Sequence, residues 1–168
     1  MQTAIDQFLE SLERARGFDT IYTPISSQAI AVLDLTDVLR AEILLAVSAF
    51  DQLIHELARI GMIEIFGNNR PRTDAYLRFR VSLESTHSAL SAPGLNDWLD
   101  EEIRSQHSWR SFQRSDNVAD AIRLIYPLPL WQAVAQELGE DQQILRNRLD
   151  LIVDRRNKIA HEADMDPT

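Results

Sequence analysis

Hydrophobic residues recur at steps of three and four along much of the chain, which is the spacing that places them on one face of an α-helix. The clearest case is a long helix beginning at Thr36 or Asp34 and ending at Gly61, with an apolar stripe of Ile43, Val47, Phe50, Ile54 and Leu57. A second long helix is predicted over 140–163, with Leu145, Leu149, Ile152, Ile159 and Ala163 as its stripe. We expect these two helices to be the longest and to pack against each other.

Shorter stretches of the same pattern account for most of the remaining chain. They predict helices over 3–16, 82–90, 96–109, 115–125 and 130–138, the first ended by Gly17 and the last by Gly139. Residues 18–28 are expected to be a connector. Residues 77–83 alternate between apolar and polar, but no second strand could pair with them, so we expect an extended segment. The prediction is an all-α bundle of roughly six or seven helices.

Length and composition favour one domain spanning 1–168, with an N-terminal helix and connector over 1–30 and a core over 36–164. The absence of cysteine excludes disulfides and thiolate metal sites. The longest apolar stretch is interrupted by Asp51, His55 and Glu56, and the first helix carries acidic residues. We therefore expect no membrane span, no signal peptide and a cytoplasmic location. The net charge of −9 argues against a general nucleic-acid coat.

The chemically most suggestive stretch lies near the end of the second long helix. Arg156 falls within the apolar stripe, where a guanidinium needs a partner or a ligand because an unpaired buried charge is costly. His161 comes five residues later, which turns it about 140° away from Arg156 on an ideal helix. Asn157 shares the His161 side instead. Two copies of the chain, or a loosened helix end, could bring Arg156 and His161 together.

The hexapeptide Arg156-Asn157-Lys158-Ile159-Ala160-His161 resembles the Arg-polar-x-x-x-His signature of the HEPN superfamily. Residues 149–164 as a whole resemble the RiboL-PSP-type branch of that superfamily. The similarity extends to the run 130–139 before this helix, to an early helix over 39–51, and to 111–113 with Asn117 in the middle of the chain. It covers most of the chain from residue 36, although only the C-terminal motif is specific.

The resemblance implies an all-α homodimer in which Arg and His of both subunits line one cleft. It further implies a metal-independent endoribonuclease without a cofactor, from a toxin–antitoxin or phage-defence system and acting with an antitoxin or defence partner. His161 would move a proton at the ribose 2′-hydroxyl or the leaving 5′-oxygen, and Arg156 would stabilise phosphoryl charge. Asn157 would orient His161 or a phosphate oxygen. Arg155 and Lys158 would contact substrate phosphates. The alternative is a non-catalytic HEPN module that dimerises and binds a partner protein or a nucleotide.

Other candidates have competing interpretations. Asp51, at the edge of its stripe, is expected to support the site by pairing with Arg156 or Arg155. Lys158 could instead pair with Asp154 and Glu162 at four-residue spacing. Glu84 and His87 form the Glu-x-x-His unit of di-iron sites, but no second unit exists. Four arginines lie close together in the sequence with two aromatic residues among them: Arg70, Arg72, Arg78, Arg80, Tyr76 and Phe79. This group could form an RNA-binding strip, and a solvated loop would explain it equally well.

Overall fold

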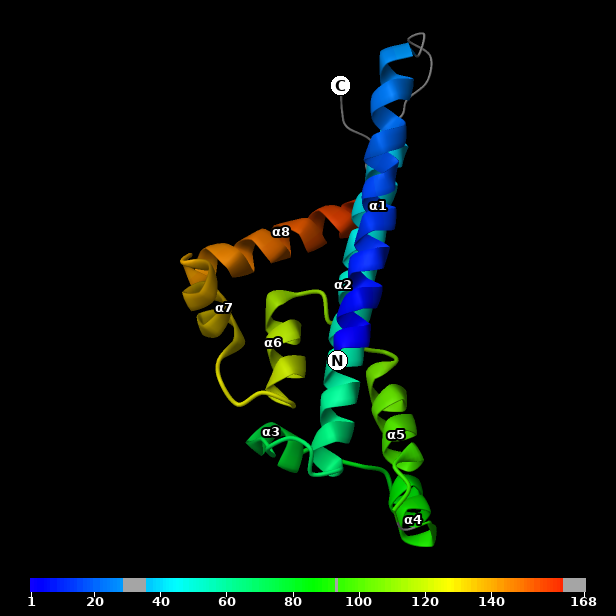
Figure 1. The fold of residues 1–168 in the computed structure, drawn as a ribbon, viewed down its shortest axis with the longest axis vertical. Coiled ribbons are helices and arrows are strands. Elements are labelled where there is room, and N and C mark those ends of the chain that lie inside the picture. The colour runs from blue at the N-terminus through cyan, green and yellow to red at the C-terminus, as the bar shows by residue number, and fades with distance from the viewer. Residues whose placement is uncertain (29–35, 93, 162–168) are drawn as a thin grey trace.

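The computed structural model describes residues 1–28, 36–92 and 94–161, and within these ranges the chain forms eight α-helices and no strand (Figure 1). The helices are α1 (Gln2–Gln28), α2 (Thr36–Phe66), α3 (Asp74–Leu77), α4 (Leu83–Ser91), α5 (Asp97–His107), α6 (Ser115–Arg123), α7 (Leu130–Leu138) and α8 (Gln142–His161). The predicted all-α fold is confirmed. Of the two N-cap candidates for the first long helix, Asp34 lies outside the described residues.

The first helix is much longer than predicted. α1 has 27 residues and runs along α2, which has 31 (Figure 1). The predicted stop at Gly17 and the connector over 18–28 are therefore wrong. Glycine inside a helix costs only about 1 kcal/mol relative to alanine, and continued packing on α2 offsets that cost. Ala4 and Ala15 are buried, and the rings of Phe8 and Phe50 meet edge to face at 6.4 Å.

The second helix also passes the glycine expected to end it. α2 continues through Gly61 to Phe66 because Gly61 is a packing position. A Cβ atom there would lie 2.6 Å from Cγ2 of Ile125, so the absent side chain allows the segment after α6 to approach the helix backbone. The turn that follows α2 contains Asn68 in the left-handed region at φ 60°, a conformation that asparagine tolerates better than most residues.

Several helix ends agree with local signals in the sequence. Ser82 caps α4 by accepting a hydrogen bond from the Ser85 N–H at 3.1 Å. Gly139 ends α7 in the left-handed conformation at φ 66°. Asn96 occupies the predicted N-cap of α5 but makes no side-chain capping hydrogen bond. These local signals placed α4, α5 and α7 close to their observed bounds.

The segment predicted to be extended over 77–83 begins within a short helix. Thr73 caps α3 by accepting a hydrogen bond from the Tyr76 N–H at 3.0 Å. The Thr73 hydroxyl also donates to the carbonyl oxygen of Leu124 at 2.9 Å. Because Leu124 directly follows α6, one buried threonine both starts α3 and attaches it to the C-terminal end of α6.

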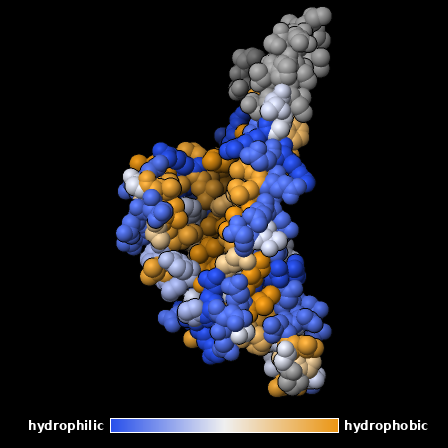
Figure 2. Space-filling model, in the orientation of Figure 1, coloured by the Kyte–Doolittle hydropathy of each residue, from blue (hydrophilic) through white to orange (hydrophobic). Residues whose placement is uncertain are grey.

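Two clusters of buried side chains form the core on either side of α6. One cluster joins α2 to α6 and to the loop that follows α5, through Ile54, Ala58, Phe112, Val118 and Ala121. The other joins α2, α5 and the segment after α6 through Met62, Ile65, Leu99, Ile103 and Ile125. Figure 2 shows hydrophobic side chains gathered in the hollowed region between the α6–α8 part and the α1–α2 pair. The second half of the chain is thus packed onto α2.

α8 contacts α2, which confirms the predicted contact between these two helices. Its inward face differs from the predicted stripe, since Val153 is 2% exposed whereas Ile152 is 52% exposed. Leu145 and Leu149 precede Val153 at four-residue steps and are partly buried. Leu151 is 68% exposed, so α8 also presents large aliphatic side chains to solvent.

Candidate functional site

The predicted catalytic residues lie on the last two turns of α8. The helix is continuous through His161, so the loosened helix end does not occur up to this residue. Arg156 and His161 therefore remain about 140° apart around the helix axis. Asn157 lies between them in direction, four residues before His161. A single site that used both the guanidinium and the imidazole would need a second chain.

Arg156 is a partly buried cation that has no carboxylate partner among the described residues. Its Nη1 donates a hydrogen bond to Oδ1 of the neighbouring Asn157 at 3.1 Å. Its Nε is buried and has no hydrogen-bond partner. An unsatisfied buried donor costs about 1–3 kcal/mol, so Arg156 retains the capacity to bind a polar or anionic ligand.

The charged side chains flanking Arg156 are exposed. Arg155 and Lys158, the predicted phosphate contacts, both lie on the solvent side of α8. Asp154, one of the two acids considered as a partner for Lys158, forms an ion pair with Arg114 instead; the other, Glu162, lies outside the described residues. The exposed positions of Arg155 and Lys158 are compatible with contact to a ligand at this end of α8.

Asp51 supports a different part of the molecule from the one predicted. Its Oδ1 accepts a hydrogen bond from the Phe112 N–H at 2.6 Å, and its Oδ2 accepts one from Nε2 of Gln113 at 3.2 Å. Of the two partners expected for Asp51, Arg156 is wrong, and pairing with Arg155 stays a prediction. The loop after α5 buries Phe112 and Gln113, and their N–H donors need an acceptor away from water. Asp51 supplies that acceptor from α2.

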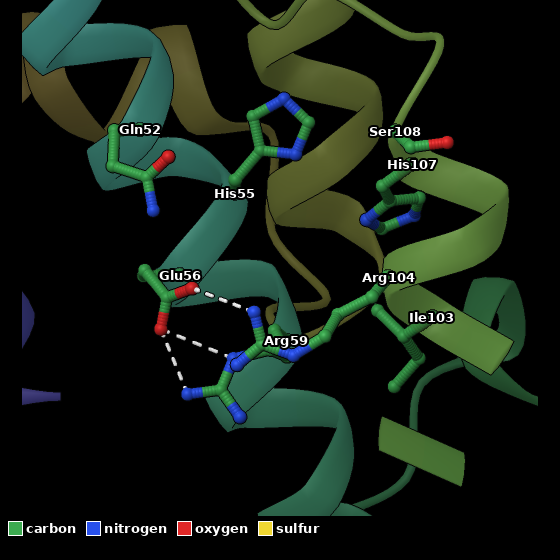
Figure 3. A pocket seen from close by; sticks show the side chains of 8 residues that line it. All are labelled: Gln52, His55, Glu56, Arg59, Ile103, Arg104, His107 and Ser108. Atoms are coloured by element: carbon green, nitrogen blue, oxygen red, sulfur yellow. Dashed lines mark hydrogen bonds and ion pairs between the residues drawn. The ribbon is translucent and has the colours of Figure 1, made fainter. Parts of the chain in front are cut away.

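A hollow of about 270 Å³ lies between α2 and α5 and is lined by charged side chains of both helices (Figure 3). Arg59 donates to Glu56 at 2.7 Å and to Asp100 at 2.7 Å. Arg104 donates to Asp100 at 3.1 Å. Burial raises the pKa of Asp100, but the hydrogen bonds from Arg59 and Arg104 outweigh it and hold the pKa below its ordinary value. Two cations and two carboxylates thus neutralise one another and join α2 to α5.

His107 closes one side of this hollow and was not among the predicted site residues. It is 3% exposed and packs edge-on against Phe112, with ring centroids 5.1 Å apart, and lies 6.1 Å from the ring of His55. Burial lowers the pKa of His107 to about 4, and His55 and Arg110 add to the effect. The imidazole is therefore neutral at pH 7, and its Nδ1 has no hydrogen-bond partner. No periodic pattern in the sequence could reveal a cluster drawn from separate elements.

The arginines proposed to form an RNA-binding strip divide into two groups. Arg70 pairs with Glu64 at 3.0 Å, and Arg72 donates to the Asn68 side chain at 3.2 Å. Arg78 and Arg80 are exposed, and neither has a carboxylate partner within the described part of the chain. The first group stabilises the turn after α2, and only the second is available to a ligand.

The Glu-x-x-His unit on α4 lies on the surface. Both Glu84 and His87 are exposed. Within residues 1–28, 36–92 and 94–161, no three histidine or carboxylate side chains are grouped as metal ligands. His87 is thus a surface histidine of α4.

None of the helices described combines the length and the hydrophobicity needed to cross a bilayer. Comparisons of the chain with protein-family models, with curated proteins and with solved structures found no match.

Proposed function

We propose that the chain is a metal-independent endoribonuclease that acts as a homodimer, with Arg156, Asn157 and His161 as its catalytic residues. The observation that carries the proposal is the state of Arg156: partly buried, hydrogen-bonded only to Asn157, and without a carboxylate partner among the described residues. It occupies the position of the Arg in the Arg-polar-x-x-x-His motif whose His is the exposed His161. A phosphodiester oxygen is the kind of acceptor that such a guanidinium favours.

The directions of the two side chains support the homodimer as part of this proposal. One α8 turns Arg156 and His161 to different sides, whereas a two-fold axis near the helix end could place Arg156 of one copy beside His161 of the other. The aliphatic side chains that α8 exposes would add apolar area to such a contact: Ile144 at 48%, Leu151 at 68% and Ile152 at 52%.

The proposed reaction is transesterification within RNA. His161 accepts the proton of a ribose 2′-hydroxyl, or protonates the leaving 5′-oxygen, a role suited to an imidazole near pH 7. The 2′-oxygen forms a bond to phosphorus as the bond to the 5′-oxygen breaks, which leaves a 2′,3′-cyclic phosphate and a free 5′-hydroxyl. Arg156 stabilises the charge on the non-bridging oxygens. The substrate supplies its own nucleophile, so DNA is not cleaved.

A role in a toxin–antitoxin or phage-defence system is part of the same proposal and is carried by the resemblance of the α8 motif to HEPN nucleases. Growth on expression tests it. Wild-type protein should slow growth of the host, and Arg156→Ala should relieve that effect. Equal toxicity of the two proteins would count against a nuclease toxin.

Cleavage is tested by incubating purified protein with single-stranded RNA or transfer RNA in the presence of EDTA. We expect wild type to produce 2′,3′-cyclic phosphate ends, and His161→Ala to reduce the rate by roughly 10²–10⁴-fold. His87→Ala, which removes an exposed histidine of α4, is the matched control and should cleave like wild type. Intact RNA with every protein would reject the nuclease. A dimer that binds RNA without cleaving it would identify the non-catalytic alternative.

A further inference from the structure

Three of the arginines without a carboxylate partner lie together on the surface. Most arginines that the structure describes form ion pairs with an acid, as Arg123 does with Asp120 at 2.8 Å. Arg78, Arg80 and Arg110 have no carboxylate partner among the described residues, and all three line one hollow of about 300 Å³. The chain carries a net charge of −9, so three unpaired guanidinium groups in one place form a local cationic site against an acidic background.

The hollow is formed by segments that are distant in the sequence. Arg78 and Arg80 come from the link between α3 and α4, whereas Arg110 comes from the loop that follows α5. Nε2 of Gln106 donates a hydrogen bond to the Arg80 carbonyl oxygen at 2.6 Å, which fixes the link against α5. The loop carrying Arg110 is held by the hydrogen bonds of Asp51 to its far end. Both arginine-bearing segments are therefore anchored to helices.

An exposed aromatic residue stands beside the three arginines. Trp109 is 75% exposed, and the guanidinium carbon of Arg110 lies 4.9 Å from the centre of its ring. A second hollow, of about 330 Å³, is lined by Trp109, Arg110 and Phe112 and shares Arg110, Phe112 and Asp120 with the first. The charge of Asp120 is balanced by its ion pair with Arg123. Arginine for phosphates and an exposed indole for a base is the combination by which proteins bind single-stranded nucleic acid.

We propose that Arg78, Arg80, Arg110 and Trp109 form a docking site for single-stranded RNA, in which the arginines contact successive phosphates and the indole stacks on a base. The choice of RNA as ligand rests on the proposed function, but the site is separate from Arg156 and His161.

The arginine site and the middle of α8 are connected through α6. The cap of α3 is bonded to Leu124, directly after α6, while Ser115 at the start of α6 is bonded to α8 through Asp150. α3 and α8 thus meet opposite ends of α6 (Figure 1).

The test measures binding of a short fluorescein-labelled single-stranded RNA in which every ribose is 2′-O-methylated, because this probe cannot undergo transesterification. The variant R78Q/R80Q/R110Q should bind roughly tenfold or more weakly than wild type, and its salt dependence should be less steep by about 2 in log–log slope, near 0.7 per lost phosphate contact. Trp109→Ala should weaken binding by roughly tenfold through lost stacking.

The matched control is R14Q/R16Q/R148Q, which removes the same charge at exposed arginines that already pair with acids. The control should bind nearly as wild type does, and circular dichroism should show both triple variants folded. Equal affinities for the two triple variants, no binding by wild type, or tighter binding of a polyglutamate peptide than of the RNA would each overturn the proposal.

The same probe separates this inference from the nuclease proposal. Arginine-dependent binding together with uncleaved natural RNA would reject the nuclease and leave the docking site standing. Cleavage that depends on His161, with binding indifferent to R78Q/R80Q/R110Q, would reject the docking site and leave the nuclease standing.

Discussion

Asp150 of α8 accepts two hydrogen bonds from Ser115, the first residue of α6: one from its main-chain N–H at 2.9 Å and one from its hydroxyl at 2.8 Å. Ser115 is 1% exposed. Arg114, at the N-cap position of α6, makes no side-chain capping bond. A carboxylate from another helix therefore satisfies the buried N-terminal donor of α6, where the helix dipole also favours negative charge. This contact fixes α6 to the helix that carries the candidate catalytic residues.

Replacing this carboxylate should lower stability measurably. We expect Asp150→Ala to reduce the free energy of unfolding by about 2 kcal/mol, as for hydrogen bonds to a charged group. Asp150→Asn should lose less, because an amide oxygen can still accept one of the two bonds. Urea denaturation followed by circular dichroism measures the change. Glu137→Ala, at an exposed acid of α7, is the control, and a midpoint for Asp150→Ala equal to that of the control would contradict the capping role.

Asp51 should matter for the fold rather than for the chemistry on α8. We expect Asp51→Ala to lower the free energy of unfolding by about 2 kcal/mol, because the Phe112 N–H then loses its acceptor in a buried loop. Single-turnover cleavage per folded molecule should stay close to wild type. Thermal melts and RNA cleavage on the same samples measure the two effects. Unchanged stability with lost cleavage would show instead that Asp51 supports the site on α8.

Glu102 should make the protein sensitive to acid between pH 4.5 and about 2. The Ser85 hydroxyl, Gln106 and Ser82 donate hydrogen bonds to its carboxylate and outweigh burial, which lowers the pKa from 4.5 to about 2. A depressed carboxyl pKa stabilises the folded state above pH 4.5, and that contribution is lost as the pH falls toward 2. Glu102→Gln should be less stable at pH 7 by about 2 kcal/mol, and the difference should shrink with acid.

The neighbouring Glu101 is exposed, so Glu101→Gln is the control for the Glu102→Gln variant. Urea unfolding at a series of pH values should give nearly parallel curves for wild type and Glu101→Gln. The curve for Glu102→Gln should instead converge on wild type below pH 4.5. Curves for Glu102→Gln and wild type that stay parallel down to pH 3 would show that the hydrogen bonds of Glu102 do not depend on its charge.

His107 should cause a separate loss of stability at milder pH. Burial, followed by the influence of His55 and Arg110, lowers its pKa from 6.5 to about 4. The folded state therefore resists protonation that the unfolded state accepts, so stability is full above pH 6.5 and declines as the pH falls toward 4. His107→Phe should lack this decline, because phenylalanine does not titrate. The slope of unfolding free energy between pH 6.5 and 5 measures it. His87→Phe, on the surface of α4, should keep the wild-type slope.

If Arg156 of one subunit acts with His161 of the other, two inactive variants should restore activity when they form a mixed dimer. Arg156→Ala and His161→Ala should each be inactive alone. After the two proteins are mixed and allowed to exchange, half of the dimers are mixed, and each mixed dimer keeps one intact Arg156–His161 pair. We expect recovery of up to about a quarter of wild-type cleavage. Sedimentation verifies that dimers form. Verified mixed dimers without recovery would show that the two residues do not act across a subunit contact.

Local patterns predicted the elements whose boundaries depend on local chemistry. Gly139 ends α7 and Ser82 begins α4 because left-handed backbone and hydroxyl capping are properties of a few adjacent residues. The same reasoning failed at Gly17 and Gly61. A glycine need not end a helix, and what packs at Gly61 is Ile125, which lies far away in the sequence.

For the candidate site too, some features could be predicted from the sequence and others depend on the tertiary structure. The sequence by itself determined the helical fold and grouped Arg156, Asn157 and His161 within one helix, because helical periodicity is a property of consecutive residues. Only the tertiary structure decided that Asp51 binds the Phe112 loop and that Arg110 joins Arg78 and Arg80 in one hollow. Charge pairing falls off with distance in space, and that distance is set by how separate helices pack.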